Sequence, residues 1–395
     1  RKWVFAYKPR GRFYSARTYL SWVYLLLFFG IPFLKVNGEP WLLLNVIERK
    51  FIVFGFVFWS QDFYLFGITM ILFVVFIIVF TVAFGRLFCG WACPQTIFME
   101  MVFRKIEYWI DGDAPAQQAL KRKPWNAEKI RKRITKWIVF YAVSFLIGNA
   151  FLAYIIGVDH LKQFIMDPWG THVKGLIAMM LFSFIFFLVY LRFREQVCTV
   201  VCPYGRLQGV LLDRHSVVVA YDYVRGEPRE KLHKGTQRKG GDCVDCNLCV
   251  HVCPTGIDIR NGTQLDCTNC TACIDACDFM MDKTGKPQGL IRYASESNIA
   301  DAKPFEITPR LKAYIAVLVL LLAGWLSILF TRSAVDMEVR KVPGLLYQER
   351  ENGEVTNLYN FMFLNKSHRN YSKLNVRVIQ ANGRVEWVGG DTIIQ

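Results

Sequence analysis

Apolar residues in this chain gather into long runs that dominate the pattern as far as residue 330. A helix needs about 20 such residues to cross the hydrocarbon core of a bilayer. Five runs approach or meet that length, and we expect each to be a membrane helix: 19–34, 63–84, 137–158, 175–193 and 313–330. The pattern therefore predicts an α-helical integral membrane protein with five spans.

A sixth apolar stretch, 41–59, is interrupted by Glu48, Arg49 and Lys50. Three consecutive charged residues are too costly for the centre of a bilayer. We therefore expect a re-entrant or interfacial segment here rather than a span.

After residue 330 the long apolar runs give way to short stretches in which apolar and polar residues are mixed. Short stretches of mixed apolar and polar residues at 335–341, 355–364 and 374–380 are separated by Gly and Asn. This is typical of short antiparallel strands, so we expect a C-terminal β domain.

Positive charge is distributed unevenly between the connections. The net charge is +16, and Lys and Arg concentrate in the N-terminal tail, in RKRITK at 131–136 and in the long connection before the last span. In a chain this apolar, such a bias indicates cytoplasmic loops rather than nucleic-acid binding. We expect the N-terminus and these connections in the cytoplasm, and the C-terminus on the other side because the number of spans is odd.

All twelve cysteines fall into four tight groups. Their spacings of two or three residues are too short for a disulfide framework and fit reduced thiolates that bind metals or clusters. The predicted orientation places every group on the reducing, cytoplasmic side. The groups are Cys89 and Cys93; Cys198 and Cys202; Cys243, Cys246, Cys249 and Cys253; and Cys267, Cys270, Cys273 and Cys277.

The last two groups repeat one spacing. Residues 243–254 have the Cys-x2-Cys-x2-Cys-x3-Cys-Pro pattern of bacterial two-cluster ferredoxins, and 267–277 repeats it with Asp278 in place of the proline. In that pattern three thiolates bind one 4Fe-4S cluster and the fourth reaches the other. We assign one cluster to Cys243, Cys246, Cys249 and Cys277, and the other to Cys267, Cys270, Cys273 and Cys253. Two zinc sites are the alternative, but tetrahedral zinc is hard to reconcile with two interlocked runs.

The first two groups share Cys-x3-Cys-Pro after a span, in CGWACPQT at 89–96 and CTVVCPYG at 198–205. Cysteines four positions apart lie on one face of a helix, so two such pairs could offer four thiolates to one metal. Soft thiolates select Cu(I), zinc or iron–sulfur clusters. Three interpretations stay open: a copper site, a third cluster, and structural zinc or unligated thiols.

Basic residues flank these two motifs. We interpret them mainly as anchors at the membrane surface, which could also offset the negative charge of thiolates. They are Arg86, Arg104, Lys105, Arg192, Arg194 and Arg206.

The sequence closely resembles the cbb3-type cytochrome c oxidase accessory protein family, called CcoG, FixG or RdxA. The resemblance is carried by FGRLFCGWACPQTIFMEMVFRKIEYWIDGD at 84–113, VCPYGRLQ at 201–208 and the double ferredoxin run. It implies a cupric reductase of the bacterial inner membrane that supplies Cu(I) to the oxidase. Cys89, Cys93, Cys198 and Cys202 then become the candidate catalytic copper site.

The resemblance also implies a periplasmic immunoglobulin-like domain at the C-terminus. Only about 65 residues follow the last span, whereas a seven-stranded sandwich needs about 100, so we expect an incomplete domain. The expected organisation is four spans and the first motif in 1–193, a cytoplasmic segment with the second motif and the two-cluster domain in 194–310, the fifth span in 311–330 and the β domain in 331–395.

The hypothesis is that an unknown cytoplasmic donor reduces the clusters, which then reduce Cu(II) at the juxtamembrane thiolates. Oxidase subunits and copper chaperones or transporters are the expected partners, and a homodimer stays open. One rival is a quinol-linked electron-transfer subunit of a respiratory reductase. The other is a non-enzymatic assembly factor that binds copper or senses redox state. No Gly-rich nucleotide fingerprint follows a strand, so we expect no nicotinamide or flavin site.

Overall fold

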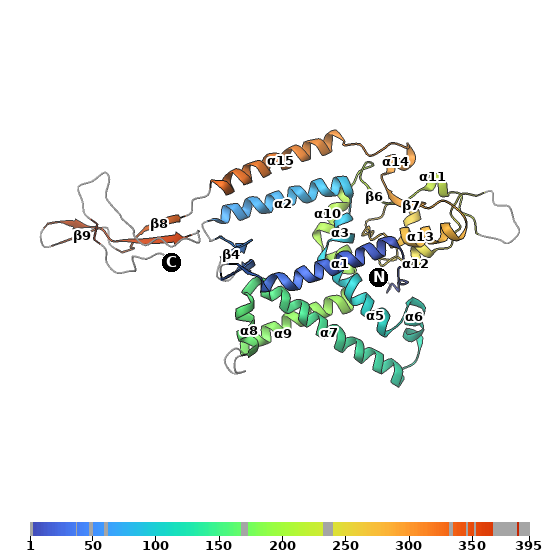
Figure 1. Cartoon of the computed structure of the whole chain (residues 1–395), viewed down its shortest axis with the longest axis horizontal. Coiled ribbons are helices and arrows are strands. Elements are labelled where there is room, and N and C mark those ends of the chain that lie inside the picture. The colour runs from blue at the N-terminus through green and yellow to red at the C-terminus, as the bar shows by residue number, and fades with distance from the viewer. Residues whose placement is uncertain are drawn as a thin grey trace.

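The computed structural model describes residues 3–365 apart from positions 37, 47–49, 59–61, 167–172, 232–239, 332–334, 345–346 and 351–352, together with residues 385 and 386. Figure 1 shows long helices side by side, with a cysteine-rich domain at one end and strands at the other.

Five helices in the described residues are long and apolar enough to span a membrane, which confirms the predicted number. The first and fourth end in short 3-10 and π segments, η1 (Ile31–Phe33) and η4 (Val189–Phe193). The helices are α1 (Arg12–Gly30), α2 (Phe63–Phe84), α7 (Ala127–Ile156), α9 (Val173–Leu188) and α15 (Pro309–Phe330).

Four of these helices, α1, α7, α9 and α15, begin earlier than their apolar runs. Helix α7 starts ten residues before the predicted position, where the Asn126 side chain accepts a hydrogen bond from the Lys129 amide. Helix α15 starts at Pro309 after Thr308, whose hydroxyl accepts from the Leu311 amide. Hydropathy marks only the part of a helix that lies in lipid, whereas the capping residues set where the helix begins.

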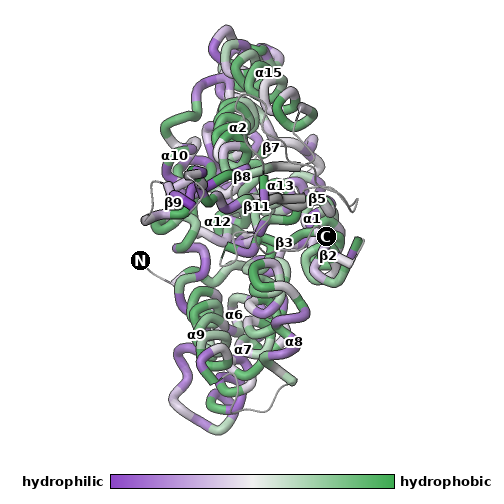
Figure 2. The backbone as a smooth tube through the Cα atoms, turned by 90° about the vertical axis from the view of Figure 1, so that its left-hand side faces the viewer, coloured by the Kyte–Doolittle hydropathy of each residue, from purple (hydrophilic) through white to green (hydrophobic). Residues whose placement is uncertain are grey.

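The spans form two groups. Helices α1, α7 and α9 share a largely aromatic cluster that includes Phe28, Phe140 and Phe186. Helices α2 and α15 lie side by side (Figures 1 and 2), and the Trp325 indole donates to the Thr69 hydroxyl over 2.9 Å. Figure 2 also shows that both helices are hydrophobic along most of their length, as expected for surfaces that face lipid.

The interrupted stretch at 41–59 contains strands and is not a helical span, as expected; its location at the membrane interface stays a prediction. Strands β3 (Leu42–Asn45), β4 (Lys50–Val53) and β5 (Phe56–Phe58) make an antiparallel sheet. The tight turn between β4 and β5 contains Phe54 and Gly55, both with positive φ. The apolar residues are largely Val, Ile and Phe, which favour a pleated surface, and the turn lets them pair.

The cysteine-rich domain has a small sheet beside it, in which β6 (Val218–Tyr221) pairs antiparallel with β7 (Ile291–Ala294). Its core includes Tyr221, Ile259, Met281 and Leu290, which pack around cysteine side chains. The remaining elements of this domain are α11 (Tyr223–Gly226), α12 (Leu248–His251), η6 (Ile259–Asn261), α13 (Ala272–Lys283) and α14 (Glu296–Ala300).

The C-terminal region contains strands, as predicted. Strand β8 (Val335–Lys341) has the predicted bounds and pairs antiparallel with β11 (Tyr359–Asn365). Residues 357 and 358 break the predicted strand at 355–364 into β10 (Val355–Thr356) and β11, and β10 pairs with β9 (Gln348–Glu349). The predicted strand at 374–380 lies outside the described residues.

Short elements complete the described chain. They are β1 (Lys35–Val36), β2 (Glu39–Pro40), α3 (Leu87–Trp91), α4 (Pro94–Thr96), the π-helix η3 (Ile97–Phe103), α5 (Arg104–Ile110), α6 (Ala114–Arg122), α8 (Val158–Met166), the π-helix η5 (Val197–Val201) and α10 (Pro203–Leu211).

The close contact between α7 and α9 at Gly148 leads to a prediction. A Cβ atom there would lie 3.2 Å from the Ser183 hydroxyl and 3.5 Å from its Cα atom. Gly148→Leu should therefore force the helices apart and cost about 1–3 kcal/mol. Gly67→Leu, on α2 with nothing within 4 Å, is the matched control. Thermal unfolding in detergent measures both, and equal melting temperatures would contradict the packing seen here.

Candidate functional site

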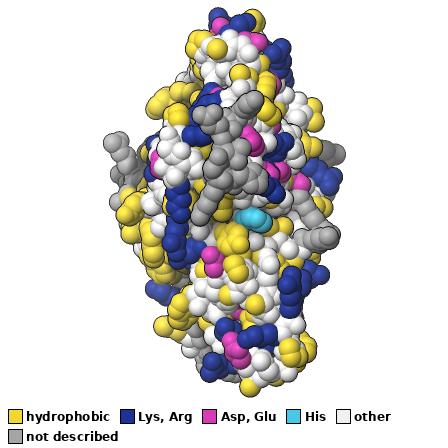
Figure 3. All heavy atoms as spheres, turned by 90° about the vertical axis from the view of Figure 1, so that its right-hand side faces the viewer, with side chains coloured by type: hydrophobic (Ala, Val, Ile, Leu, Met, Phe, Trp, Pro, Cys, Tyr) yellow, Lys and Arg dark blue, Asp and Glu magenta, His cyan; other side chains and the backbone are white. Residues whose placement is uncertain are grey.

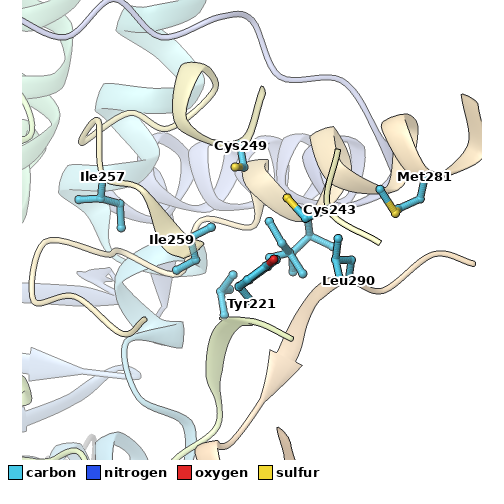
Figure 4. Packing of buried hydrophobic residues seen from close by; sticks show 10 residues of the cluster. Tyr221, Cys243, Cys249, Ile257, Ile259, Met281 and Leu290 are labelled. Carbon is cyan, nitrogen blue, oxygen red and sulfur yellow. The ribbon is translucent and has the colours of Figure 1, made fainter. Parts of the chain in front are cut away.

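Two cavities in the cysteine-rich domain are lined by cysteines, and each contains one predicted quartet. The first is lined by Cys243, Cys246, Cys249 and Cys277. The second is lined by Cys253, Cys267, Cys270 and Cys273, and Cys249 also reaches it. Figure 4 shows Cys243 and Cys249 beside Tyr221, Ile259 and Leu290. Four thiols around a mostly apolar cavity fit a 4Fe-4S cluster, so these two quartets are the residues that would hold the clusters.

The turns that arrange these cysteines repeat between the two runs. Asp245 and Asn247 flank Cys246, and Asn269 and Thr271 flank Cys270; all four have positive φ between 48° and 64°. Asn and Asp adopt this left-handed conformation more readily than most residues. These turns were not predicted, although three Asx residues beside the middle cysteines are visible in the sequence.

Burial makes these thiols hard to ionise without a nearby cation. It raises the pKa of Cys249, Cys267 and Cys277 to about 12, with neighbouring thiols adding to the effect at each. Thiolates are the form that binds metals, and the positive charge of the bound metal is what stabilises them in such surroundings.

The two juxtamembrane pairs do not lie on continuous helices, which corrects the prediction of one shared helical face. Cys89 lies in α3, whereas Cys93 has extended backbone angles and precedes α4. Cys198 and Cys202 repeat this arrangement between η5 and α10. Proline follows the second cysteine in each motif. A proline pushes the preceding residue out of the helical region and favours the first position of a new helix.

All four juxtamembrane cysteines nevertheless lie near one another. Burial, together with Cys93, Cys89 and Cys202, raises the pKa of Cys198 to about 12. Burial likewise raises the pKa of Cys89 to about 11, where Arg86 opposes the effect and Cys93 and Cys202 add to it. Two motifs more than 100 residues apart thus contribute to one thiol group.

This group is a neighbourhood of thiols rather than a preformed coordination site. Throughout the part of the chain that the structure describes, no three His, Cys, Asp or Glu side chains stand at metal-binding spacing, the cluster quartets included. A bound ion would have to draw the sulfur atoms together.

The first juxtamembrane motif packs directly against the second cluster-binding loop. A Cβ atom on Gly90 would lie 2.5 Å from the Asn269 carbonyl oxygen and 2.6 Å from that of Thr268. Both residues lie between Cys267 and Cys270, while Gly90 follows Cys89. Only glycine allows this approach of backbone to backbone.

Two buried arginines hold this contact together. Arg17 of α1 donates to the Gly90 carbonyl over 3.0 Å and to the Cys270 carbonyl over 2.8 Å. Arg86 donates to the carbonyls of Leu265 and Cys267 in the cluster loop. A guanidinium has five donors in a rigid fork, so one side chain can bind several backbone carbonyls at once.

Arg86 also joins the two motifs through a residue that the sequence analysis missed. It donates to the Gln208 side-chain carbonyl over 2.6 Å, and the Cys89 thiol lies 3.5 Å from the same oxygen. Gln208 is fully buried in α10, which follows Cys202. A polar residue in an amphipathic segment gives no sequence signal of this role.

Burial of Arg86, Arg104 and Arg194 corrects the interpretation that these residues are mainly surface anchors. Each is at most 6% exposed. Arg194 donates to Glu107 over 2.6 Å, and Lys136 binds Glu107 and Asp111. Burial alone would raise the pKa of Glu107, but Arg194 and Lys136 together lower it to about 2. Acidic residues on η3 and α5 face these bases, and this pairing was not visible from hydropathy.

The crossed arrangement of cysteines predicts which substitutions share a cluster. Cys253→Ser combined with Cys273→Ser should remove about half of the bound iron, because both ligate one cluster. Cys253→Ser combined with Cys249→Ser should remove nearly all of it, because each cluster loses a ligand. Iron analysis and low-temperature EPR of the reduced proteins measure this. Equal losses in the two double variants would contradict the assignment.

The contact at Gly90 predicts sensitivity to one methyl group. Gly90→Ala should separate the motif from the cluster loop and destabilise the protein by about 1–3 kcal/mol. Gly30→Ala, at the end of α1 with nothing within 4 Å, is the matched control. Thermal unfolding of both variants, with iron content as a second measurement, tests the contact; a melting temperature equal to that of Gly30→Ala would rule it out.

Comparison with known families covers most of the chain. A model described as a 4Fe-4S dicluster domain matches residues 193–296. A model described as a 4Fe-4S binding domain matches 66–113, which contain α2 and the first juxtamembrane pair. A model described as an IG-like fold at the C-terminal of FixG matches 325–394. No solved structure matches the chain.

Three relatives are similar over long stretches. Protein RdxB of Cereibacter sphaeroides is 35% identical over 379 residues, which are 92% of this chain and 79% of RdxB. Protein RdxA of the same organism is 35% identical, with 92% of this chain and 80% of RdxA covered. Nitrogen fixation protein FixG of Rhizobium meliloti is 36% identical over 320 residues, 76% of this chain and 58% of FixG. With its five spans, its paired cysteine cavities and these relatives, the chain belongs to the FixG/RdxA family of membrane-bound iron–sulfur proteins of the oxidoreductase type.

Proposed function

We propose that this protein is a cupric reductase, in which the four juxtamembrane cysteines receive Cu(II) and release Cu(I). The observation that supports this most strongly is the packing of Gly90 against the loop between Cys267 and Cys270. It puts Cys89 one residue from the wall of a cluster cavity, with no intervening layer of side chains at that point.

Copper suits the chemistry of the juxtamembrane thiols. Cu(II) gains one electron to become Cu(I), and no bond to hydrogen forms or breaks. The clusters, when bound, supply single-electron transfer over a range of low potentials. Cys89, Cys93, Cys198 and Cys202 would stabilise the soft Cu(I) product more than the Cu(II) substrate.

Two neighbouring side chains, Arg86 and Gln208, influence how readily the Cys89 thiol ionises. Arg86 lies close enough to lower the pKa of Cys89 against the effect of burial. Gln208 accepts hydrogen bonds from both residues and so orients them. Arg86 and Gln208 are therefore positioning residues for the copper site in this proposal.

We also propose how the protein is oriented in the membrane and where the Cu(I) goes. Lys and Arg are spread over the end of the molecule that carries the cysteine-rich domain (Figure 3), which supports a cytoplasmic location by the positive-inside rule. The C-terminal strands lie at the opposite end of the helices and would be periplasmic (Figure 1). The Cu(I) would serve the copper centre of a cbb3-type oxidase, by way of oxidase subunits, copper chaperones or transporters in the bacterial inner membrane.

A third cluster is the second candidate for the juxtamembrane cysteines. The 4Fe-4S binding family model that matches 66–113 favours it, since Cys89 and Cys93 are the cysteines in that range. Such a protein would pass electrons to a partner reductase, and copper would have no effect on it. Iron content separates the two candidates, because a third cluster raises it by about half.

The test is anaerobic and uses the purified, cluster-loaded protein. The protein is reduced with dithionite, excess reductant is removed, Cu(II) is added, and cluster absorbance is followed together with Cu(I) capture by a chelator. We expect cluster reoxidation with about one Cu(I) formed per electron released. The variant with Cys89, Cys93, Cys198 and Cys202 all changed to Ser should lose this reaction and keep the iron of the two quartets.

Two other outcomes would count against the proposal. Clusters that stay reduced after Cu(II) is added would favour the electron-transfer subunit. Copper that binds to the protein without being reduced by the clusters would favour an assembly factor.

A further inference from the structure

A large apolar cavity lies beside the juxtamembrane motif and plays no part in the copper chemistry above. Its volume is about 610 Å³, and seven of its ten lining residues are aromatic. Its outer wall is the end of α2 that leads to Cys89, with Phe73, Phe76 and Phe80. This volume is in the range of pockets that hold small organic ligands.

The cavity opens towards lipid. Phe73 and Phe76 line it and are also about half exposed, at 54% and 49%, on a helix that spans the membrane. A hydrophobic molecule dissolved in the bilayer can therefore reach it from the side. A ligand from the aqueous phase would have to cross an apolar surface.

The inner end of the cavity reaches both redox elements. Trp91 lies in α3 beside the juxtamembrane cysteines, and its indole donates to the Tyr293 hydroxyl over 2.9 Å. The Tyr293 hydroxyl lies 3.5 Å from the carbonyl oxygen of Asn269, which separates Cys267 from Cys270. One hydrogen-bonded pair of side chains thus connects the cavity wall to the second cluster loop.

The lining selects the chemistry of the occupant. None of the lining residues is charged, and the hydroxyls of Tyr204 and Tyr293 are engaged with Thr81, Trp91 and Asn269. A phospholipid headgroup would leave its charges without partners here, at a large desolvation cost. An uncharged aromatic ring stacks favourably on Phe, Tyr and Trp, and an isoprenoid tail can follow α2 into the bilayer.

We infer that this cavity binds an isoprenoid quinol from the membrane and that the quinol is the reductant of the protein. The quinol loses two electrons and two hydroxyl protons, which pass to water, and becomes the quinone. Two electrons reduce two Cu(II) ions to two Cu(I) ions. Only this last acceptor rests on the proposed function, and the donor replaces the cytoplasmic one expected from the sequence.

Quinone binding tests the inference without relying on activity. The cluster-loaded full chain in lipid nanodiscs is titrated with decylubiquinone by equilibrium dialysis, and an azido derivative is photocrosslinked and mapped by mass spectrometry. Ile77→Trp fills the cavity and should weaken binding about tenfold or more. Ile71→Trp, a lipid-exposed position on the same helix that does not line the cavity, is the matched control and should bind like wild type.

Three results would overturn the inference. They are equal affinity in both Trp variants, crosslinks confined to peptides outside the lining, and quinone retention no greater than that of protein-free nanodiscs. The crosslinking result in the wild-type protein stands even if Ile77→Trp fails to fold.

A second readout separates this inference from the copper proposal. Decylubiquinol added anaerobically without copper should bleach the clusters of the wild type and of Ile71→Trp, but not of Ile77→Trp. Dithionite-reduced Ile77→Trp should still reduce Cu(II). If the dithionite-reduced wild type leaves Cu(II) unreacted while quinol bleaches its clusters, the copper proposal fails and the quinol site stands.

Discussion

The contact between Gly90 and the loop at 268–270 buries backbone carbonyl groups around it, and each of them needs a hydrogen-bond donor. Arg17 and Arg86 supply those donors from α1 and from the end of α2. Each guanidinium is buried, so its own charge must be surrounded by acceptors. Because the carbonyls need donors and the buried guanidinium groups need acceptors, these hydrogen bonds tie two membrane helices to the cysteine-rich domain at one point. Asp275 adds a third tie, because its carboxylate accepts from the amides of Phe13 and Tyr14 in the first turn of α1.

Buried charge organises the other helix group in the same way. Glu107 lies between Arg194 at the end of η4 and Lys136 in α7, and Arg104 binds Glu195. Removing one partner of such a buried pair costs about 3–5 kcal/mol, because it leaves the other charge unpaired. Helices α5 and α7 and the end of η4 are therefore held in one arrangement, and with them the second juxtamembrane motif.

A single short helix connects the two proposed activities. Helix α3 carries Cys89 within the thiol group, and Trp91 on the same helix lines the cavity that we propose binds the quinol. The cluster loop contacts this helix at Gly90, between those two residues. In these proposals the donor, the second cluster and the acceptor would thus meet at one turn of chain, which keeps the electron-transfer steps between them short. The aromatic residues of α2 bring this turn within reach of the bilayer.

Features that arise from local spacing could be predicted before the chain's fold was known. Apolar run length predicted the five spans, and the spacing in 243–254 and 267–277 predicted the crossed cysteine quartets that line two cavities. Both patterns follow from the geometry of one continuous segment. Tertiary structure decided what depends on distant segments: the burial of Arg86 and Arg194, the role of Gln208 between the motifs, and the cavity between α2 and Tyr293. A charged or polar residue gives the same local signal whether it meets water or a partner that folding brings from more than 100 residues away, so only the folded chain reveals which it is.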